Sequence, residues 1–538
     1  MPLPTSVTAR KSKSLSRRQV EGLIADGHAI VVVHGKVLKV DAWLKYHPGG
    51  DKAIMHMVGR DATDEVNALH SPEARKCMEA YQIGQVEGLW ENFLPPIQGG
   101  HFRAYIEDDE KLQHSDENFD LSSSQNSSRS STPSSDGSIP LIRRRGPGNA
   151  TESPSSSSIS SLSSSSAVER KAETIPSYID AWTKQEIDLD LSAYPPLDPV
   201  TQDEIVQKYR LLHDRIKAEG LYECHYASYL TEICRYALLF GLCLLFLRWG
   251  WYGTSDTVIG IIIADFWGGL SLGWWKRNHN VHHIVTNSPE HDPDIEHLPF
   301  FAISHRLLLS LRSTYYDRIM SYDSFAKFFV HYQSSLYYVI LAFGRFNLYR
   351  LSWEYLILGL GPRKGPAWWH RWFEILGNIV FWYWFGYGMV YKGIPTPWGR
   401  FVFVMVSHMV TMPLHVQITL SHFAMSTADL GVRESFPQRM LRTTMDVDCP
   451  EWLDFLHGGL QFQAIHHLYP RIPRHNLRRT QKLVVEFCKD VGLPYALYGF
   501  VEGNKEVIGR LADVGRQAAI LAQCQKAVSE KADLGHHT

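Results

Sequence analysis

Residues 279–283 read His-Asn-Val-His-His, and residues 463–467 read Gln-Ala-Ile-His-His. His279 lies three and four residues before His282 and His283, and Gln463 has the same spacing to His466 and His467, so the residues of each stretch lie along one side of a helix. Neutral imidazole suits iron and zinc, and histidines that converge from separate helices can hold two metal ions inside a bundle. The two stretches therefore predict a metal enzyme.

The sequence around both stretches is apolar and aromatic and carries cations. Lys276 and Arg277 lie beside the first stretch, and Arg471 and Arg474 follow the second. Aromatic residues make up 12% of the chain and include 16 tryptophans, a usage typical of proteins at lipid interfaces. We expect the metal site to lie at a membrane surface.

Several apolar segments are candidates for membrane helices. Residues 236–252, 375–391 and 401–421 are each long enough to cross once. The last two are joined by a short loop rich in proline and glycine, which predicts a helical hairpin. Residues 258–272 and 328–346 contain polar side chains, so they are expected to form interfacial or re-entrant helices.

Charge and cysteine usage exclude other classes of protein. The net charge is −2, and the absence of a basic excess argues against nucleic acid as a partner. The seven cysteines show no CxxC spacing, so neither a disulfide framework nor a zinc ribbon is indicated. The polar N-terminus lacks the apolar run of a secretory signal, and the first domain is expected to be cytosolic.

The sequence pattern of residues 14–90 predicts a separate α+β module, with a strand at 30–33, a turn at His34-Gly35 and a second short strand. The module carries a His-Pro-Gly-Gly motif and a second histidine further on. In both respects it resembles cytochrome b5. The resemblance implies a b-type heme with His47 and His70 as its axial ligands. Pro48, Gly49 and Gly50 would form the tight turn that follows His47.

Two histidine ligands leave no open position for oxygen, so a heme held in this way would only carry electrons. The alternative is that both histidines are ordinary surface residues near a glycine turn. Asp61, Asp64 and Glu65 are expected near the heme edge, where they could steer a basic reductase, although acidic runs are more often simply solvated.

Residues 108–166 are rich in serine and contain a basic patch at 143–145. Such a segment cannot bury enough apolar surface to fold, which predicts a disordered linker that is either a passive tether or a site of regulation by phosphorylation. The expected organisation is a heme domain at 10–95, the linker at 96–175, a pre-membrane segment at 176–228, the membrane domain at 229–500 and a C-terminal tail at 501–538.

The two histidine stretches resemble the second and third boxes, HxxHH and QxxHH, of the membrane-bound desaturases with a histidine-rich diiron centre. QxxHH occurs in the front-end subgroup that is fused to cytochrome b5. The longer run at 269–283 resembles the fungal sphingolipid 8-position desaturases. The resemblance implies a small α+β cytochrome b5-like domain followed by an all-α integral-membrane desaturase domain.

The same resemblance implies the ligands of two iron ions. The box residues that it assigns are His279, His282, His283, His466 and His467, with Gln463 supporting the third box. His422 is either a further ligand or a buried, hydrogen-bonded histidine. His291 and His297 are expected to be loop residues, and His457 to support a ligand from behind.

The implied reaction inserts a double bond into the long-chain base of a ceramide or sphingoid base with molecular oxygen. Removing hydrogen from an unactivated alkyl chain requires an oxidant made at a metal. Electrons would come from an NAD(P)H-dependent cytochrome b5 reductase through the fused heme. The protein would cross the membrane of the endoplasmic reticulum several times, with its heme domain and histidine boxes facing the cytosol. The alternatives are a front-end fatty acyl-lipid desaturase and a heme electron-transfer protein. A zinc hydrolase is disfavoured because the boxes hold no glutamate base.

The chain departs from the family at the first box, HDxxH. Residues 251–256 run directly into the apolar segment at 257–266, and no histidine occurs between His225 and His279. One helix and one ligand pair are therefore predicted to be missing. Three complete spans would also put His279 on the opposite side of the membrane from a cytosolic heme domain. We expect the diiron centre of this chain to be incomplete.

Overall fold

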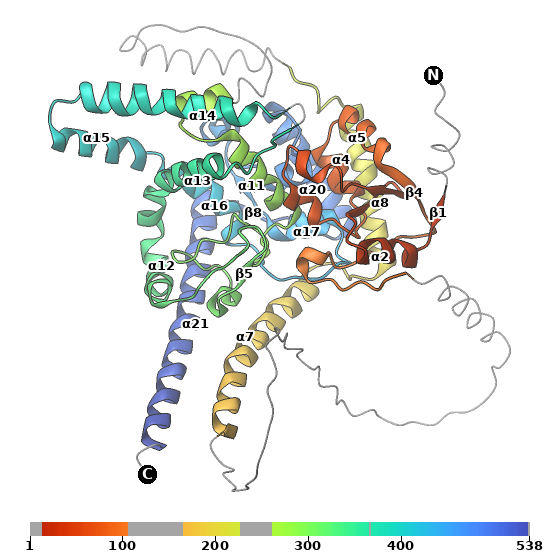
Figure 1. Cartoon of the computed structure of the whole chain (residues 1–538), viewed down its shortest axis with the longest axis horizontal. Coiled ribbons are helices and arrows are strands. Elements are labelled where there is room, and N and C mark those ends of the chain that lie inside the picture. Colours follow the sequence, from red (N-terminus) through yellow and green to blue (C-terminus); the bar gives the residue numbers. More distant parts are fainter. Residues whose placement is uncertain (1–12, 106–164, 226–260, 365–366, 536–538) are drawn as a thin grey trace, which may run out of the picture. The chain divides into compact units, whose positions relative to one another are not determined.

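The computed structural model describes residues 13–105, 165–225, 261–364 and 367–535 (Figure 1). Residues 13–104 and 175–535 belong to one compact unit. The predicted span at 236–252 and the place of the missing first box lie outside the described residues.

The N-terminal module contains a four-stranded sheet in the order β1-β4-β3-β2. β2 and β3 form an antiparallel hairpin, whereas β1 pairs with β4 in parallel. His34 and Gly35 both have positive φ, 50° and 68°, and make the predicted turn between β2 and β3. The strands are β1 (Ser14–Leu15), β2 (Ile30–Val33), β3 (Lys36–Lys39) and β4 (Gln82–Val86).

Short helices cover this sheet and frame the two heme-ligand candidates. The first begins with a capping box, in which the Ser16 and Gln19 side chains each bond the other's backbone N–H. His47 lies just before α3, and His70 ends α4. The helices are α2 (Arg17–Ala25), α3 (Asp51–Met55), α4 (Thr63–Leu69) and α5 (Pro72–Met78), with 3-10 turns η1 (Leu44–Tyr46), η2 (Glu79–Tyr81) and η3 (Pro96–Gln98).

Two helices follow the linker, α7 (Ser165–Ala193) and α8 (Pro199–Ala218). α8 buries Ile205, Tyr209 and Ile216 on one face, at helical spacing. That face packs in one apolar cluster with residues from the C-terminal third of the chain. The pre-membrane segment is therefore part of the folded core.

The rest of the described chain is mostly helical, which confirms the predicted fold class. Four very short strands pair as β5 (Arg312–Ser313) with β6 (Arg318–Ile319) and β7 (Asp446–Asp448) with β8 (Leu497–Gly499). The helices are η4, a π-helix (Ile262–Trp267), α11 (Leu272–Ile284), η5 (His305–Leu309), α12 (Ser324–Ala342), α13 (Gly344–Leu358), α14 (His370–Phe381), η6, a π-helix (Trp382–Lys392), α15 (Pro397–Met409), α16 (Met412–Phe423), α17 (Phe436–Thr443), η7 (Glu451–Leu453), α18 (Asp454–His457), α19 (Gln463–Leu468), η8 (Arg474–Asn476), α20 (Leu477–Val491) and α21 (Phe500–Gly535).

The helices at 370–423 carry the apolar surface. Among the described residues, Pro397–Phe423 is the one helical segment that is both long and apolar enough to cross a membrane. η6 contacts α15, and the turn between them ends where Thr396 caps α15, as the predicted hairpin requires. Large side chains such as Trp372, Tyr383 and Trp398 stay more than half exposed here, which suits a surface that faces lipid.

The two weaker apolar segments have different surroundings. The first becomes η4, where buried Asp265 accepts a hydrogen bond from Asn378. The second becomes α12, which packs along α21, and Gln333 donates to the Leu511 carbonyl across that contact. α21 occupies the segment expected to be a tail (Figure 1).

Candidate metal centre

Six histidines gather into two groups of three, and within each group the possible ligand atoms lie within 4.8 Å of one another. α11, α16 and α19 supply all six. The first group consists of His279, His283 and His466, and the second of His282, His422 and His467.

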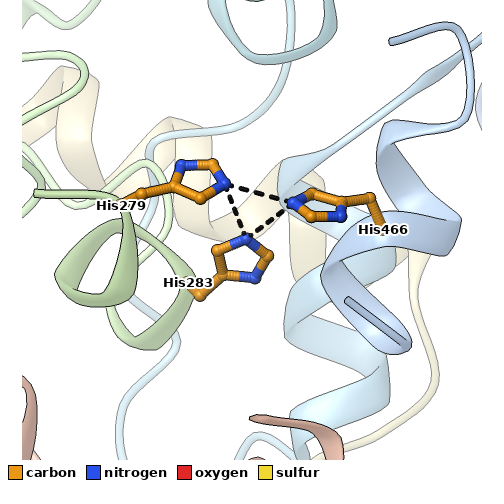
Figure 2. Close-up of side chains that lie close together, drawn as sticks. All are labelled: His279, His283 and His466. Carbon is orange, nitrogen blue, oxygen red and sulfur yellow. Dashed lines mark hydrogen bonds between the residues drawn. The ribbon is translucent and has the colours of Figure 1, made fainter. Parts of the chain in front are cut away.

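In the first group three ring nitrogens converge on one point (Figure 2). The Nε2 atoms of His279, His283 and His466 are 3.1 Å apart in every pair. A neutral ring nitrogen either donates or accepts, so three nitrogens in mutual contact cannot make three hydrogen bonds. A cation that takes all three lone pairs would satisfy them together, and this donor set suits iron.

The second group is more deeply buried. The Nε2 atoms of His282 and His467 are 3.2 Å apart. The His422 ring stands edge-on to both, with ring centroids 4.6 Å from His282 and 4.9 Å from His467. The structure thus brings His422 to the box histidines, in a group that could hold a second ion.

A carboxylate behind the second group fixes the orientation of one ring. Buried Asp292 accepts from His282 Nδ1, with distances of 2.8 and 3.0 Å to its two oxygens. Backbone N–H groups of Asn287 and Asp294 also donate to Asp292. Because Nδ1 is held by Asp292, the His282 ring presents Nε2 toward His467, the nitrogen that a metal ion would take. Sequence reasoning treated this segment as a loop and missed Asp292, whose only signal was a carboxylate soon after a histidine box.

Local hydrogen bonds also fix the start of the six-residue helix α19. The Ala464 N–H donates to Asp446 Oδ1 over 2.8 Å, and Gln481 and Tyr495 donate to Oδ2 of the same carboxylate. Asp446 is fully buried. No sequence motif marked it, although it holds the first turn of the helix that carries His466 and His467.

The protonation of the histidines suits metal binding. Burial lowers the pKa of His466 to about 3, and it lowers the pKa values of His283 and His467 well below the usual range. These rings are neutral at neutral pH, as ligands must be. His282 is the exception: burial acts in the same direction, but the neighbouring carboxylates, Asp292 first, raise its pKa to about 9. Without a metal this ring is protonated at neutral pH, and an ion that binds it has to displace the Nε2 proton.

The other candidates lie elsewhere in the described part of the chain. Gln463 is the first residue of α19 and is buried. His457 ends α18 with its ring against Phe500, outside both groups. His297 packs on Phe423, and His291 lies beside a histidine of the N-terminal module. His291 and His297 thus lie in loops, as expected, and the supporting role of His457 remains a prediction.

The N-terminal module holds a second pair of facing imidazoles. The ring centroids of His47 and His70 are 5.9 Å apart, which leaves room for one ion with bonds of about 2 Å to each ring. His47 Nδ1 donates to the Gly50 carbonyl over 2.8 Å, so its Nε2 is free to bind a metal. Gly50 has φ of 86°, the left-handed turn that the motif predicted. The residues fit a heme iron.

The expected reductase-steering face is not an open surface. Asp64 is buried and pairs with Arg210, and Glu65 is buried and pairs with Arg439. Asp61 accepts from Thr63 and shapes the start of α4. In this arrangement residues far along the chain cover Asp64 and Glu65, and their expected role in steering a reductase remains a prediction.

Comparison with known proteins agrees with both sites. Residues 16–87 match the cytochrome b5-like heme/steroid binding domain, and residues 237–499 match the fatty acid desaturase family. Two triads of histidines behind a heme-binding module define an iron-dependent desaturase with its own electron carrier. This chain belongs to the fatty acid desaturases that are fused to a cytochrome b5 domain.

Within that class the chain is similar to proteins named Delta 8-(E)-sphingolipid desaturase. It is 59% identical to the one from Emericella nidulans, over 98% of this chain and 99% of the relative. The one from Kluyveromyces lactis is 46% identical, over 98% and 97%. A protein from Borago officinalis named acyl-lipid (9-3)-desaturase is 35% identical over 59% of this chain and 76% of its own length.

Proposed function

We propose that this protein introduces a double bond at the 8-position of the long-chain base of a sphingolipid. The observation that carries the proposal is 59% identity to a Delta 8-(E)-sphingolipid desaturase across nearly the full length of both chains. The acyl-lipid desaturase from Borago officinalis matches far less of the chain, so a ceramide or free sphingoid base is favoured over a fatty acyl lipid.

Bound iron would supply the activation of oxygen, which no side chain can provide. His279, His283 and His466 would hold one ion, and His282, His422 and His467 the other. Forming the double bond takes two hydrogens from the substrate and turns O2 into two molecules of water. Two more electrons and two protons are therefore needed, and an NAD(P)H-dependent cytochrome b5 reductase would supply the electrons through the fused heme.

The proposed location is the membrane of the endoplasmic reticulum, with several crossings and with both metal sites on the cytosolic side. The apolar helix at Pro397–Phe423 and the exposed aromatic side chains near it support membrane insertion. Contacts between the heme module and α11, such as the ion pair of Asp51 with Arg277, support a common side for the two sites.

The substrate is tested in a fungal host that lacks its own 8-desaturase. The chain is expressed with a family-like helix and HDxxH segment restored after Tyr252, and double bonds are located by mass spectrometry in sphingoid bases and in fatty acids. We expect an 8-unsaturated long-chain base. Unsaturation in fatty acyl chains alone would replace this proposal with the front-end acyl-lipid alternative.

A second function is favoured by the missing first box: the chain as written would carry electrons through the heme without desaturating. Six histidines offer three ligands to each ion. The alignment with the Emericella nidulans relative extends over 560 positions, more than the 538 residues of this chain, so the relative has stretches that this chain lacks. We expect the chain as written to bind less non-heme iron per heme than the restored chain and to yield no product. Robust product from the chain as written would show that six histidines suffice.

A further inference from the structure

The faces that surround the heme-ligand histidines are covered, through ion pairs, by α8 and by the desaturase domain. Arg210 of α8 holds Asp64 with two hydrogen bonds, 2.9 and 3.2 Å long. Arg439 of α17 pairs with Glu65 over 3.2 Å. Both carboxylates lie in the first turn of α4, the helix that ends at His70. Less than a tenth of either acidic side chain is exposed.

The loop of the other axial histidine is covered by α11. Arg277 pairs with Asp51 over 3.1 Å. A Cβ placed on Gly49 would lie 2.5 Å from Asn280 Nδ2, and one on Gly50 would lie 3.0 Å from Cγ of Arg277. Both glycines of the His-Pro-Gly-Gly motif therefore permit close approach to the helix that carries three box histidines.

A further contact joins the second axial histidine to the third box. Arg471, four residues after His467, donates to the carbonyl of His70 over 3.1 Å. One ion pair across this contact has the reverse polarity, with its cation on the heme module: Lys52 of α3 contacts Asp317 Oδ2 over 2.8 Å. Apolar side chains of α11, among them Val281 and Ile284, belong to the same core cluster as the heme module.

We propose that electrons pass from the heme to the histidine groups while the heme module is docked in this way, and that the docked module cannot bind the reductase. The heme module must therefore separate from the rest of the chain before the reductase can reduce it. A reductase with a basic surface would need the carboxylates of Asp51, Asp64 and Glu65, which three arginines from outside the heme module already occupy. The arginines and the reductase compete for one acidic face. Because a heme carries one electron at a time, each double bond takes two rounds of release and return.

This inference rests on the proposed electron transfer, but docking can be measured without any product. The carbodiimide EDC joins amines to carboxylates that are in direct contact. In the heme-loaded full chain it should link Lys52 to Asp317 across the interface. It should also link Lys36 to Glu79, which are 3.0 Å apart within the heme module, and this second link is the internal control. Both are counted by mass spectrometry of the digested protein.

The soluble catalytic domain of an NADH–cytochrome b5 reductase is then titrated in. We expect the Lys52–Asp317 link to fall by about tenfold at saturation, with the Lys36–Glu79 link unchanged, because charged contacts at an interface are competed by a like-charged partner. The double variant Arg210→Glu/Arg439→Glu should lose the interface link without reductase and should accept electrons from the reductase at least as fast as the parent. Lys217→Glu, a single reversal of charge on an exposed part of α8, should behave as the parent.

A heme spectrum checks that each variant is folded. The titration of the unsubstituted chain with the reductase tests the proposal without any variant. If the reductase reduces the heme at full rate while the Lys52–Asp317 link persists, or if that link never forms, the proposal is overturned.

Discussion

Asp292 is the residue that sequence reasoning overlooked and the structure places directly behind His282, a proposed iron ligand. It fixes the proton of His282 on Nδ1. We predict that Asp292→Asn lowers the affinity for non-heme iron by about 10- to 100-fold, the usual effect of losing a carboxylate behind a ligand histidine. Iron per heme after dialysis against a chelator measures this. Asp203→Asn, on an exposed part of α8, is the control, and equal iron retention in both variants would refute the role.

The assigned ligands make a sharper prediction. His282→Ala and His466→Ala each remove one histidine from a different group. Each should abolish desaturation by the restored chain and leave the heme spectrum unchanged, because His47 and His70 lie in a different module. Double-bond analysis of extracted sphingoid bases measures the first effect. Activity retained in either variant would show that its group is not a metal site.

Residue spacing alone was enough to predict that the histidines of the first stretch lie on one face of a helix. His279 and His283 share a face of α11 because they are four residues apart. It could not predict that α11 contributes to both groups, because the division depends on where His466 and His467 approach it. His422 was left open for the same reason, since α16 is distant in sequence and only the packed structure brings it to His282.

At the scale of elements, the N-terminal module can be tested in isolation. The structure shows that its edge lies further along than the predicted boundary at 95, because Arg103 pairs with Glu21 and Phe102 packs on Phe93. We predict that a fragment of residues 10–105 binds one b-type heme in a six-coordinate, low-spin form, and that His47→Ala or His70→Ala abolishes that spectrum. The fragment 10–95 should melt about 5 °C lower, as expected for a loss of about 1 kcal/mol in a small domain. A folded fragment that stays colourless with heme supplied would remove the electron-carrier assignment.

Another element-scale prediction concerns the link between α7 and α17. Arg442, only 2% exposed, bonds Glu434 over 2.7 and 3.0 Å and Asp190 over 2.7 Å. We predict that Arg442→Ala destabilises the protein by about 3–5 kcal/mol, because two carboxylates are left without their partner in a buried site. Thermal unfolding in detergent, followed by a core tryptophan signal, measures this. Arg516→Ala, an exposed pair on α21, should change stability by less than about 1 kcal/mol.

Long, periodic segments were predictable as helices, whereas short ones were not. The hairpin at 375–421 follows from its apolar runs and the intervening Pro/Gly turn. α19 has only six residues, too few for periodicity to define, and its start depends on Asp446 from another segment. The burial of the acidic face of α4 could not be predicted because the arginines that cover it lie far away in sequence, on α8 and α17.

At the scale of the whole molecule, the order of domains could be predicted, because each carries its own motif. The position at which the heme module packs on the rest of the chain could not be predicted, since it depends on ion pairs such as Asp51 with Arg277 that join separate domains. The central claim is that the heme bound by His47 and His70 supplies electrons to the two histidine groups.

The most direct measurement follows the heme after it has been reduced. The restored chain is prepared with ferrous heme and mixed with oxygen and ceramide, and the heme absorbance is recorded in a stopped-flow instrument, alongside the same chain with His466→Ala. We predict that the heme of the variant is reoxidised at least about tenfold more slowly than that of the parent, because its electron acceptor has lost a ligand. Equal rates of reoxidation in the two proteins would contradict the account, since the heme would then lose its electrons without the histidine groups.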